Sequence, residues 1–255
     1  MNKPLRWVYG VTTVPERRAD LLPRTLVSLD RAGFPSPRIF VDGCADAGLY
    51  SSHQATLRPP PALGVYGNWI MSAWELYIRE PAGSYYALFQ DDVLAYRNLR
   101  PYLEKTLDPE ARRYYNLYAY PDNEILAHGQ VGWHPSNGRG LGALGLVFSR
   151  EALMALLSST HLARKPACVN RGKTHADGGV VEAMEVEMSQ RECGPFKETV
   201  HYPTLLYHAG TLSTQTMKFG NPRLWGPRSV AGSWRGEDFD AMELLAQPAG
   251  TSEPG

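Results

Sequence analysis

The most constraining feature of the chain is an apolar and aromatic run, residues 85–89, that is followed by Gln90 and two adjacent carboxylates, Asp91 and Asp92. A run of this kind is typical of a strand covered on both faces of a sheet. In open α/β sheets, ligands bind at the carboxyl edge of the strands, and a carboxylate there can hold a hard divalent cation. The alternative is an ordinary turn in which both carboxylates are solvated.

The elements expected before this strand form a β-α-β succession. Residues 6–13 and 38–43 are expected to be strands, residues 19–32 a helix, and a further helix is expected from about residue 68 to residue 79. This order predicts an α/β fold with a mostly parallel sheet and a nucleotide-binding half-domain. No glycine-rich phosphate loop follows the first strand, so a metal ion would have to neutralise bound phosphates.

Several short motifs resemble, in their order along the chain, those of the GT-A glycosyltransferases. They are Thr-Thr-Val-Pro-Glu-Arg at 12–17, Val-Asp-Gly at 41–43, and Gln-Asp-Asp at 90–92, which stands at the place of the family's DxD motif. The segments 142–150 and 207–214 resemble the N-acetylglucosaminyltransferase IV-like and family 2-like branch. The resemblance covers about residues 6 to 215 and implies a Rossmann-like sandwich with helices on both sides of the sheet. The first triplet position carries an amide rather than an acid.

The resemblance implies a metal-dependent, inverting glycosyltransferase. Such an enzyme moves a hexosyl or N-acetylhexosaminyl group from a nucleoside-diphosphate sugar, with a UDP-sugar expected, to a hydroxyl on a glycan or small molecule. Mn²⁺ or Mg²⁺ is expected as cofactor, because a cation must meet the charge on the leaving diphosphate. One alternative acceptor is a hydroxymethylated base of viral DNA, against which the equal numbers of basic and acidic residues weigh, 26 of each. A nucleotidyltransferase and an inactive sugar-nucleotide-binding module are the remaining alternatives.

Two residues are expected to hold the metal. Asp92 keeps the metal position of the triplet, and His208, at the end of an expected strand over 204–208, matches the family's late His-x-Gly element. A carboxylate and an imidazole together suit Mn²⁺. The alternative for His208 is a strand-end histidine that is hydrogen-bonded to backbone.

The resemblance also implies a catalytic base, Asp177, at the start of a helix. Apolar residues at Val181, Met184 and Met188 repeat with helical spacing after it. An acceptor hydroxyl needs such a base to take its proton. Asp177 could equally be a helix N-cap, and Glu182 is the second candidate for the base.

The donor nucleotide is expected to lie along the first two strands and the helix that follows them. Arg17 is the most attractive contact, because a guanidinium pairs well with a diphosphate. Each of these residues also has an ordinary structural role open to it, such as a helix cap or strand packing. The implied donor-binding residues are Thr12, Val14, Glu16, Arg17, Asp42, Asn68, Gln90 and Asp91.

Length and composition agree with one compact domain. The resemblance makes residues 1–220 the catalytic domain, followed by a C-terminal segment, 221–246, and an expected flexible tail, 247–255. Trp225 and Trp234 lie in the C-terminal segment among glycines, prolines and arginines without a regular period. That pattern predicts either a lid over the active site or simple packing of the two tryptophans on the domain surface.

The lack of a recognisable targeting signal and the spacing of the cysteines predict a cytoplasmic protein. No apolar run reaches about 18 residues, and the first expected strand begins almost at once, so neither a membrane partner nor an anchor is expected. The three cysteines are widely spaced, which favours free thiols over disulfides. Apart from His208 and His175, which lies two residues before Asp177, the histidines, including His134 and His201, are expected on loops or the surface. The oligomeric state has no sequence signal.

Overall fold

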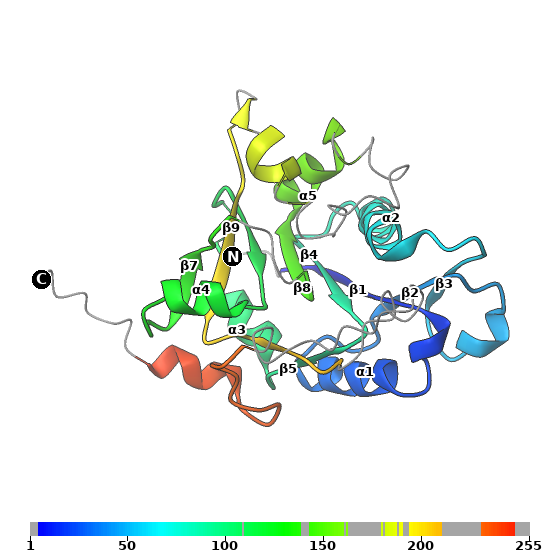
Figure 1. Cartoon of the computed structure of the whole chain (residues 1–255), viewed down its shortest axis with the longest axis horizontal. Helices are drawn as coiled ribbons and strands as arrows, with labels where there is room; N and C mark the ends of the chain where they lie inside the picture. Colours follow the sequence, from blue (N-terminus) through cyan, green and yellow to red (C-terminus); the bar gives the residue numbers. More distant parts are fainter. Residues whose placement is uncertain are drawn as a thin grey trace, which may run out of the picture.

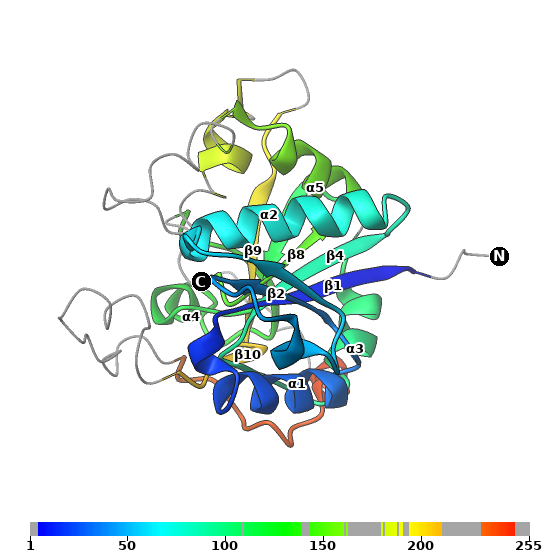
Figure 2. The ribbon, with the colours of Figure 1, turned by 90° about the vertical axis from the view of Figure 1, so that its right-hand side faces the viewer.

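The structure is a computed structural model of the whole chain. It is an α/β sandwich in which one central sheet lies between two layers of helices (Figures 1 and 2). The fold class expected from the sequence is therefore confirmed. The structure describes residues 5–108, 110–138, 143–160, 162, 180, 182–187, 189–190, 194–210 and 231–247.

The central sheet has eight strands in the order β3-β2-β1-β4-β8-β6-β9-β7. The half from β3 to β4 is parallel, whereas β8 runs antiparallel to both of its neighbours and β7 runs antiparallel to β9. A separate two-stranded sheet pairs β5 with β10. The strands are β1 (Trp7–Thr13), β2 (Arg38–Asp42), β3 (Ala55–Arg58), β4 (Tyr85–Gln90), β5 (Val93–Ala95), β6 (Arg113–Asn116), β7 (Gly132–Pro135), β8 (Gly145–Ser149), β9 (Lys197–Tyr202) and β10 (Leu206–His208).

The helices α2 and α5 cover one face of the sheet, and α1 and α3 lie on the other (Figure 2). Among the described residues, no helix has the length and apolar character needed to cross a membrane. The helices are α1 (Leu21–Arg31), α2 (Gly64–Arg79), α3 (Leu99–Thr106), α4 (Pro121–Leu126) and α5 (Arg150–Leu157), with short 3₁₀ turns η1 (Pro15–Arg17), η2 (Ala47–Tyr50) and η6 (Ala241–Ala246) and a π-helical turn η4 (Glu182–Glu187).

Helix α2 begins earlier than its sequence predicts. Both oxygens of Asp42, at the end of β2, accept backbone N–H groups at the helix start, from Leu63 at 2.9 Å and Gly64 at 2.7 Å. A carboxylate at this position satisfies N–H groups that have no partner within the helix and complements the helix dipole. The expected start at Asn68 is therefore wrong, because the capping residue, Asp42, lies at the end of β2 and not next to the helix in the sequence.

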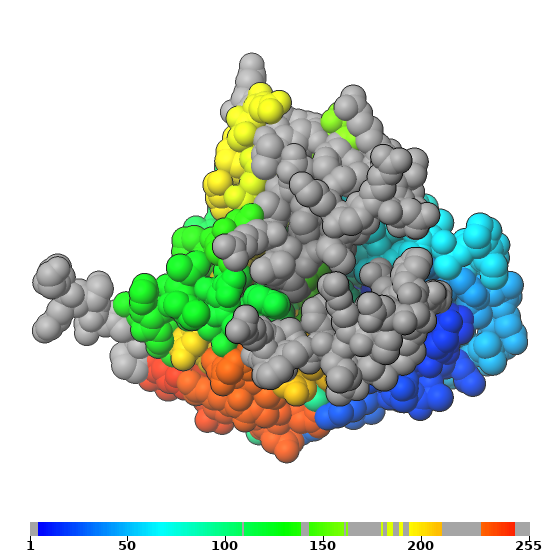
Figure 3. All heavy atoms as spheres, viewed as in Figure 1, coloured from blue at the N-terminus to red at the C-terminus, as the bar shows by residue number. Residues whose placement is uncertain are grey.

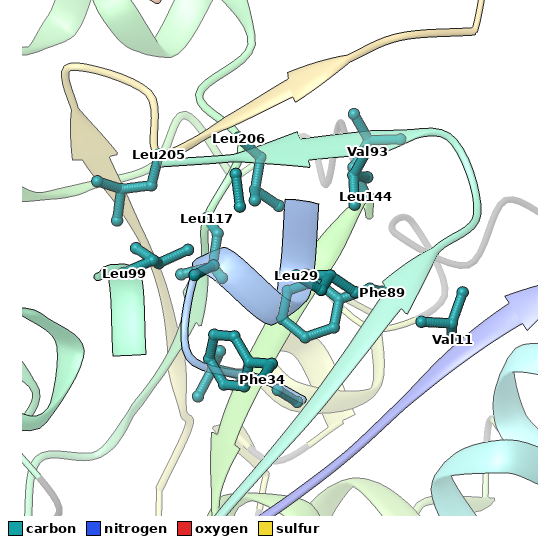
Figure 4. Close-up of a cluster of buried hydrophobic side chains, with 14 of the residues drawn as sticks. Val11, Leu29, Phe34, Phe89, Val93, Leu99, Leu117, Leu144, Leu205 and Leu206 are labelled. Carbon is teal, nitrogen blue, oxygen red and sulfur yellow. The ribbon is translucent and has the colours of Figure 1, made fainter. Parts of the chain in front are cut away.

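The main core joins the small sheet to the carboxyl ends of the central strands. Figure 4 shows Val11 of β1, Phe89 of β4, Val93 of β5 and Leu206 of β10 in one buried cluster. A side chain at Gly145 would place its Cβ 2.4 Å from Leu206 Cδ1, so Leu206 would have to shift to admit any residue larger than glycine. The cluster thereby fixes β10 beside the edge where the carboxylates lie.

The described part of the C-terminal segment, residues 231–246, packs on this core. Trp234 stacks on Tyr96 with ring centroids 4.3 Å apart, and Ala241 and Leu244 are buried. Figure 3 shows segment 231–247, in orange and red, along the lower edge of the molecule. The lid prediction now concerns residues 221–230, which lie outside the described residues, as do 248–255.

Two expected surface or loop histidines occupy strands instead. His134 lies half-buried in β7, and His201 lies in β9 with 1% of its surface exposed. The Nδ1 of His201 donates to the carbonyl of Pro203 at 2.7 Å, and its Nε2 accepts the hydroxyl of Tyr102 at 2.5 Å. Burial lowers the pKa of His201 to about 3, so the ring is neutral. Of the three cysteines, Cys44 is described, and it is a buried free thiol.

His201 should make the fold sensitive to acid. An unfolded histidine has a pKa of about 6.5, so the unfolded chain takes up a proton between about pH 6.5 and pH 3 while the folded chain does not. The free energy of unfolding should therefore fall by about 2 kcal/mol between pH 7 and pH 5 through this residue alone. Urea unfolding at the two pH values should show a smaller difference in His201→Gln, which cannot titrate. Equal pH dependence in both proteins would remove His201 as the cause.

Candidate active site

The carboxyl ends of β1 and β4 bring the candidate residues together. The two strands pair in parallel with Thr12 opposite Gln90, so the residues that follow each strand meet at one edge. Asp91 and Asp92 are 3% and 2% exposed. The alternative of a solvated turn is therefore wrong, and two buried carboxylates require partners.

Asp91 is held on both oxygens. Its Oδ2 accepts the hydroxyl of Thr13 at 2.5 Å, and its Oδ1 accepts Nη1 of Arg17 at 2.6 Å. Burial raises the pKa of Asp91 to about 6, while the guanidinium of Arg17 opposes that shift. These contacts direct Asp91 toward Arg17.

One carboxylate oxygen of Asp92 contacts Arg17 and His208, and the other has no hydrogen-bond partner among the described residues. Its Oδ2 lies 2.6 Å from Arg17 Nη1 and 3.1 Å from His208 Nε2. Its buried Oδ1 has no hydrogen-bond partner within the described part of the chain. Burial raises the pKa of Asp92. The hydrogen bond and charge of His208 and the charge of Arg17 outweigh burial and hold the pKa below its usual value, so the carboxylate is ionised. An ionised, buried oxygen without a donor fits a metal ligand.

The small sheet carries His208 to this carboxylate. β10 pairs antiparallel with β5 so that His208 lies opposite Val93, and the N–H of Ala209 donates to the carbonyl of Asp92 at 2.7 Å. The expected strand end at His208 is confirmed. β10 does not join the central sheet; it pairs with β5, the short strand that directly follows the acids.

No third protein ligand joins the pair among the described residues, where no group of three or more His, Cys, Asp or Glu side chains is placed to hold a metal. Asp92 and His208 offer carboxylate and imidazole donors, a set that suits Mn²⁺. Substrate oxygens and water would have to complete the coordination, as they do for metals that bind nucleoside diphosphates.

Gly210 leaves the space in which these side chains meet. A Cβ at this position would lie 2.8 Å from Asp92 Oδ2 and 3.2 Å from His208 Nε2. No real Cβ sits that close to a buried oxygen, so a larger residue would push Asp92 or His208 out of place.

Gly210→Ala should therefore weaken Mn²⁺ binding by about tenfold or more, the usual effect of disturbing residues that orient metal ligands. Gly232→Ala is the matched control, because its Cβ would find its nearest neighbour at an ordinary 3.6 Å. Calorimetric titration with Mn²⁺ in the presence of UDP measures both. Unchanged affinity in Gly210→Ala would place the metal elsewhere.

Three predicted donor-binding residues have their polar atoms engaged within the protein. Asp42 caps α2, as described above. Asn68 lies inside α2, where it donates to the carbonyl of Phe40 at 3.1 Å and accepts from Arg58 Nε at 2.9 Å. Gln90 donates its side-chain amide to the carbonyl of Ala143 at 2.9 Å. Their donor contacts stay predictions.

The other predicted donor residues lie at the end of β1. Thr12 is buried, with its hydroxyl 3.3 Å from the carbonyl of Phe89, and Val14 is half-buried. Glu16 is exposed, whereas Arg17 is buried between the two acids. Of this group, Arg17 therefore lies in direct contact with both carboxylates.

The catalytic base is not placed by the structure. Asp177 lies outside the described residues, and Glu182 is described only as the first residue of the π-helical turn η4. Sequence reasoning missed Thr13 and Thr25 as supports of the acidic pair. The hydroxyl of Thr25 in α1 lies 2.8 Å from the carbonyl of Asp91 and accepts the N–H of Val93 at 3.2 Å. A polar residue within the apolar face of a helix was the available signal.

No protein-family model and no curated protein sequence matches the chain. Among solved structures, GalNAc-T7 with UDP, GalNAc and Mn²⁺ is similar with a TM-score of 0.50 and 10% identity, over 78% of this chain and 44% of that chain. A glycosyltransferase involved in the glycosylation of the major capsid of PBCV-1 is similar with a TM-score of 0.40 and 10% identity, over 77% of this chain and 83% of that one. The chain thus spans less than half the length of the first structure, and it has the GT-A fold.

Proposed function

We propose that the chain is a metal-dependent glycosyltransferase that uses a nucleoside-diphosphate sugar. The observation that carries the proposal is the buried, ionised Asp92, whose Oδ1 lacks a partner in the described structure while His208 lies 3.1 Å from its other oxygen. This pair lies at the carboxyl edge of a GT-A sheet, where ligands of α/β folds bind. A divalent ion held by Asp92 and His208 would meet the charge that develops on the leaving diphosphate.

The chain's own residues supply the other roles. The guanidinium of Arg17 lies beside Asp92, and its proposed role is to pair with the diphosphate. The acceptor oxygen attacks the anomeric carbon of the donor sugar, the bond from that carbon to the phosphate oxygen breaks, and its electron pair stays on the diphosphate. Asp177 takes the acceptor proton, and attack from the opposite face inverts the anomeric configuration.

The finer assignment follows the resemblance and the metal ligands. A UDP-sugar with a hexosyl or N-acetylhexosaminyl group is the proposed donor, and the imidazole of His208 favours Mn²⁺ over Mg²⁺. The similar GalNAc-T7 structure holds UDP, GalNAc and Mn²⁺, which is consistent with this choice. The proposed acceptor is a hydroxyl of a glycan or small molecule, the proposed branch is N-acetylglucosaminyltransferase IV-like, and the proposed compartment is the cytoplasm.

Release of nucleoside diphosphate tests the proposal. The protein is incubated with Mn²⁺ and a panel of nucleotide-sugars, first alone and then with glycans or hydroxymethylated DNA as acceptors. We expect slow release from one donor, faster release with an acceptor, and loss of both after chelation or in Asp92→Asn. Asp46→Asn is the control, since it alters an exposed carboxylate that caps η2. Pyrophosphate chemistry on a nucleoside triphosphate, or donor binding without turnover, would overturn the proposal.

A further inference from the structure

Arg17 is a fixed cation inside the candidate metal site. Its Nη1 lies 2.6 Å from Asp91 Oδ1 and 2.6 Å from Asp92 Oδ2, and its side chain is 11% exposed. A guanidinium stays charged at every pH at which the protein folds, so Arg17 contributes a permanent positive charge.

The charge count disfavours a metal ion on its own. Among the described residues, Arg17 and the two ionised carboxylates sum to one negative charge, so a divalent cation on Asp92 would leave this group of residues positive. The guanidinium already contacts the carboxylate that the ion needs, and two cations repel each other strongly at short range in a buried site. A bound diphosphate supplies the missing negative charge.

We propose that Arg17 makes metal binding at Asp92 conditional on a diphosphate. This inference rests on the proposed function and deepens it. Without the diphosphate, Arg17 acts as the counter-ion of Asp92; with it, the phosphate oxygens share the guanidinium and the metal ion binds at Asp92 and His208. Because coupling between two ligands is reciprocal, Mn²⁺ must strengthen diphosphate binding by the same factor.

Asp91 is a positioning residue in this arrangement. Its two oxygens accept hydrogen bonds from Thr13 and Arg17, and the second of these holds the guanidinium against Asp92. Asp91 thus sets where Arg17 lies, and neither the donor nor the metal needs to touch it.

The test measures Mn²⁺ binding to the full chain by the electron paramagnetic resonance signal of free Mn²⁺, without nucleotide, with UDP and with GDP. Mn²⁺ held by free nucleotide is subtracted. We expect wild-type protein to bind Mn²⁺ about tenfold or more tightly with one of the two nucleotides than without either. Arg17→Gln should bind Mn²⁺ alone about tenfold more tightly than wild type, with a smaller gain from nucleotide. Arg18→Gln is the matched control, because it removes the same charge from the exposed neighbouring residue.

In Arg17→Gln, Asp91 stays buried without its ion-pair partner, which destabilises the fold. A second variant separates this effect from the effect on metal binding. Arg17→Gln/Asp91→Asn removes both charges of the pair and leaves Asp92 and His208 in place. The net charge of the cluster stays the same, so this variant isolates the guanidinium contact on Asp92 Oδ2. With that contact gone it should also bind Mn²⁺ alone more tightly than wild type, whereas loss of Mn²⁺ binding would make Asp91 a ligand and overturn the inference. Equal Mn²⁺ affinity with and without nucleotide, abolished by Asp92→Asn, would overturn the inference and leave the proposed function standing. No Mn²⁺ binding at Asp92 under any condition would instead overturn the proposed function.

Discussion

Asp92→Ala and His208→Ala should each lower metal-dependent turnover by about three orders of magnitude, the scale expected when charge stabilisation of a leaving group is lost. In the proposed site both side chains hold one ion, since His208 Nε2 lies 3.1 Å from Asp92 Oδ2. The double variant should therefore lose less than the sum of the two single losses in free energy, because the second substitution removes a ligand of an ion that is already gone. Turnover over a series of Mn²⁺ concentrations gives the kcat and the metal dependence of each variant.

His134→Ala is the control for the histidine, since His134 lies half-buried in β7 and contacts the carbonyl of Gln130 at 2.7 Å. It should keep the Mn²⁺ dependence of the wild type. Additive losses in the double variant, or unchanged metal dependence in His208→Ala, would show that Asp92 acts without His208.

Asp177→Asn should lower kcat by roughly two to four orders of magnitude while donor affinity stays the same, because the amide cannot accept the acceptor proton but leaves the donor site intact. The resemblance alone assigns this role, so the variant is compared with Glu182→Gln, the second candidate. Kinetics with a fixed acceptor and a titrated donor separate the two effects.

Near-normal turnover in Asp177→Asn together with a large loss in Glu182→Gln would move the base to Glu182. The product's anomeric configuration, read by nuclear magnetic resonance, tests the inverting assignment separately. Retention of the donor's configuration would contradict it.

Elements with a strong local pattern could be predicted from the sequence. The buried run that became β4 and the alternation of strand and helix before it predicted the parallel strands β2, β1 and β4, whereas β3 was not predicted. The start of α2 could not be predicted, because its cap, Asp42, lies 21 residues before Leu63 in the chain. The burial of His201 in β9 was missed for the same reason, since its partner Tyr102 lies 99 residues away in α3.

The sequence allowed the two aspartates of the candidate site to be predicted, but not the side chains that contact them. Two adjacent aspartates after a buried strand indicated a ligand edge, and a strand end at His208 was visible. The contacts of Arg17 with Asp91 and Asp92 join residues 74 and 75 positions apart, and they depend on the pairing of β1 with β4. The pairing of β10 with β5 has no sequence signal, because each strand is three residues long.

The coordination of Mn²⁺ by His208 is the most direct test of the metal site. Pulsed electron paramagnetic resonance on Mn²⁺ and UDP bound to protein labelled with ¹⁵N-histidine detects nitrogen in the metal's first coordination sphere. We predict coupling to a histidine nitrogen in the wild type and in His134→Ala, and its loss in His208→Ala. The same coupling in His208→Ala, or no nitrogen coupling in the wild type, would contradict a metal held by Asp92 and His208.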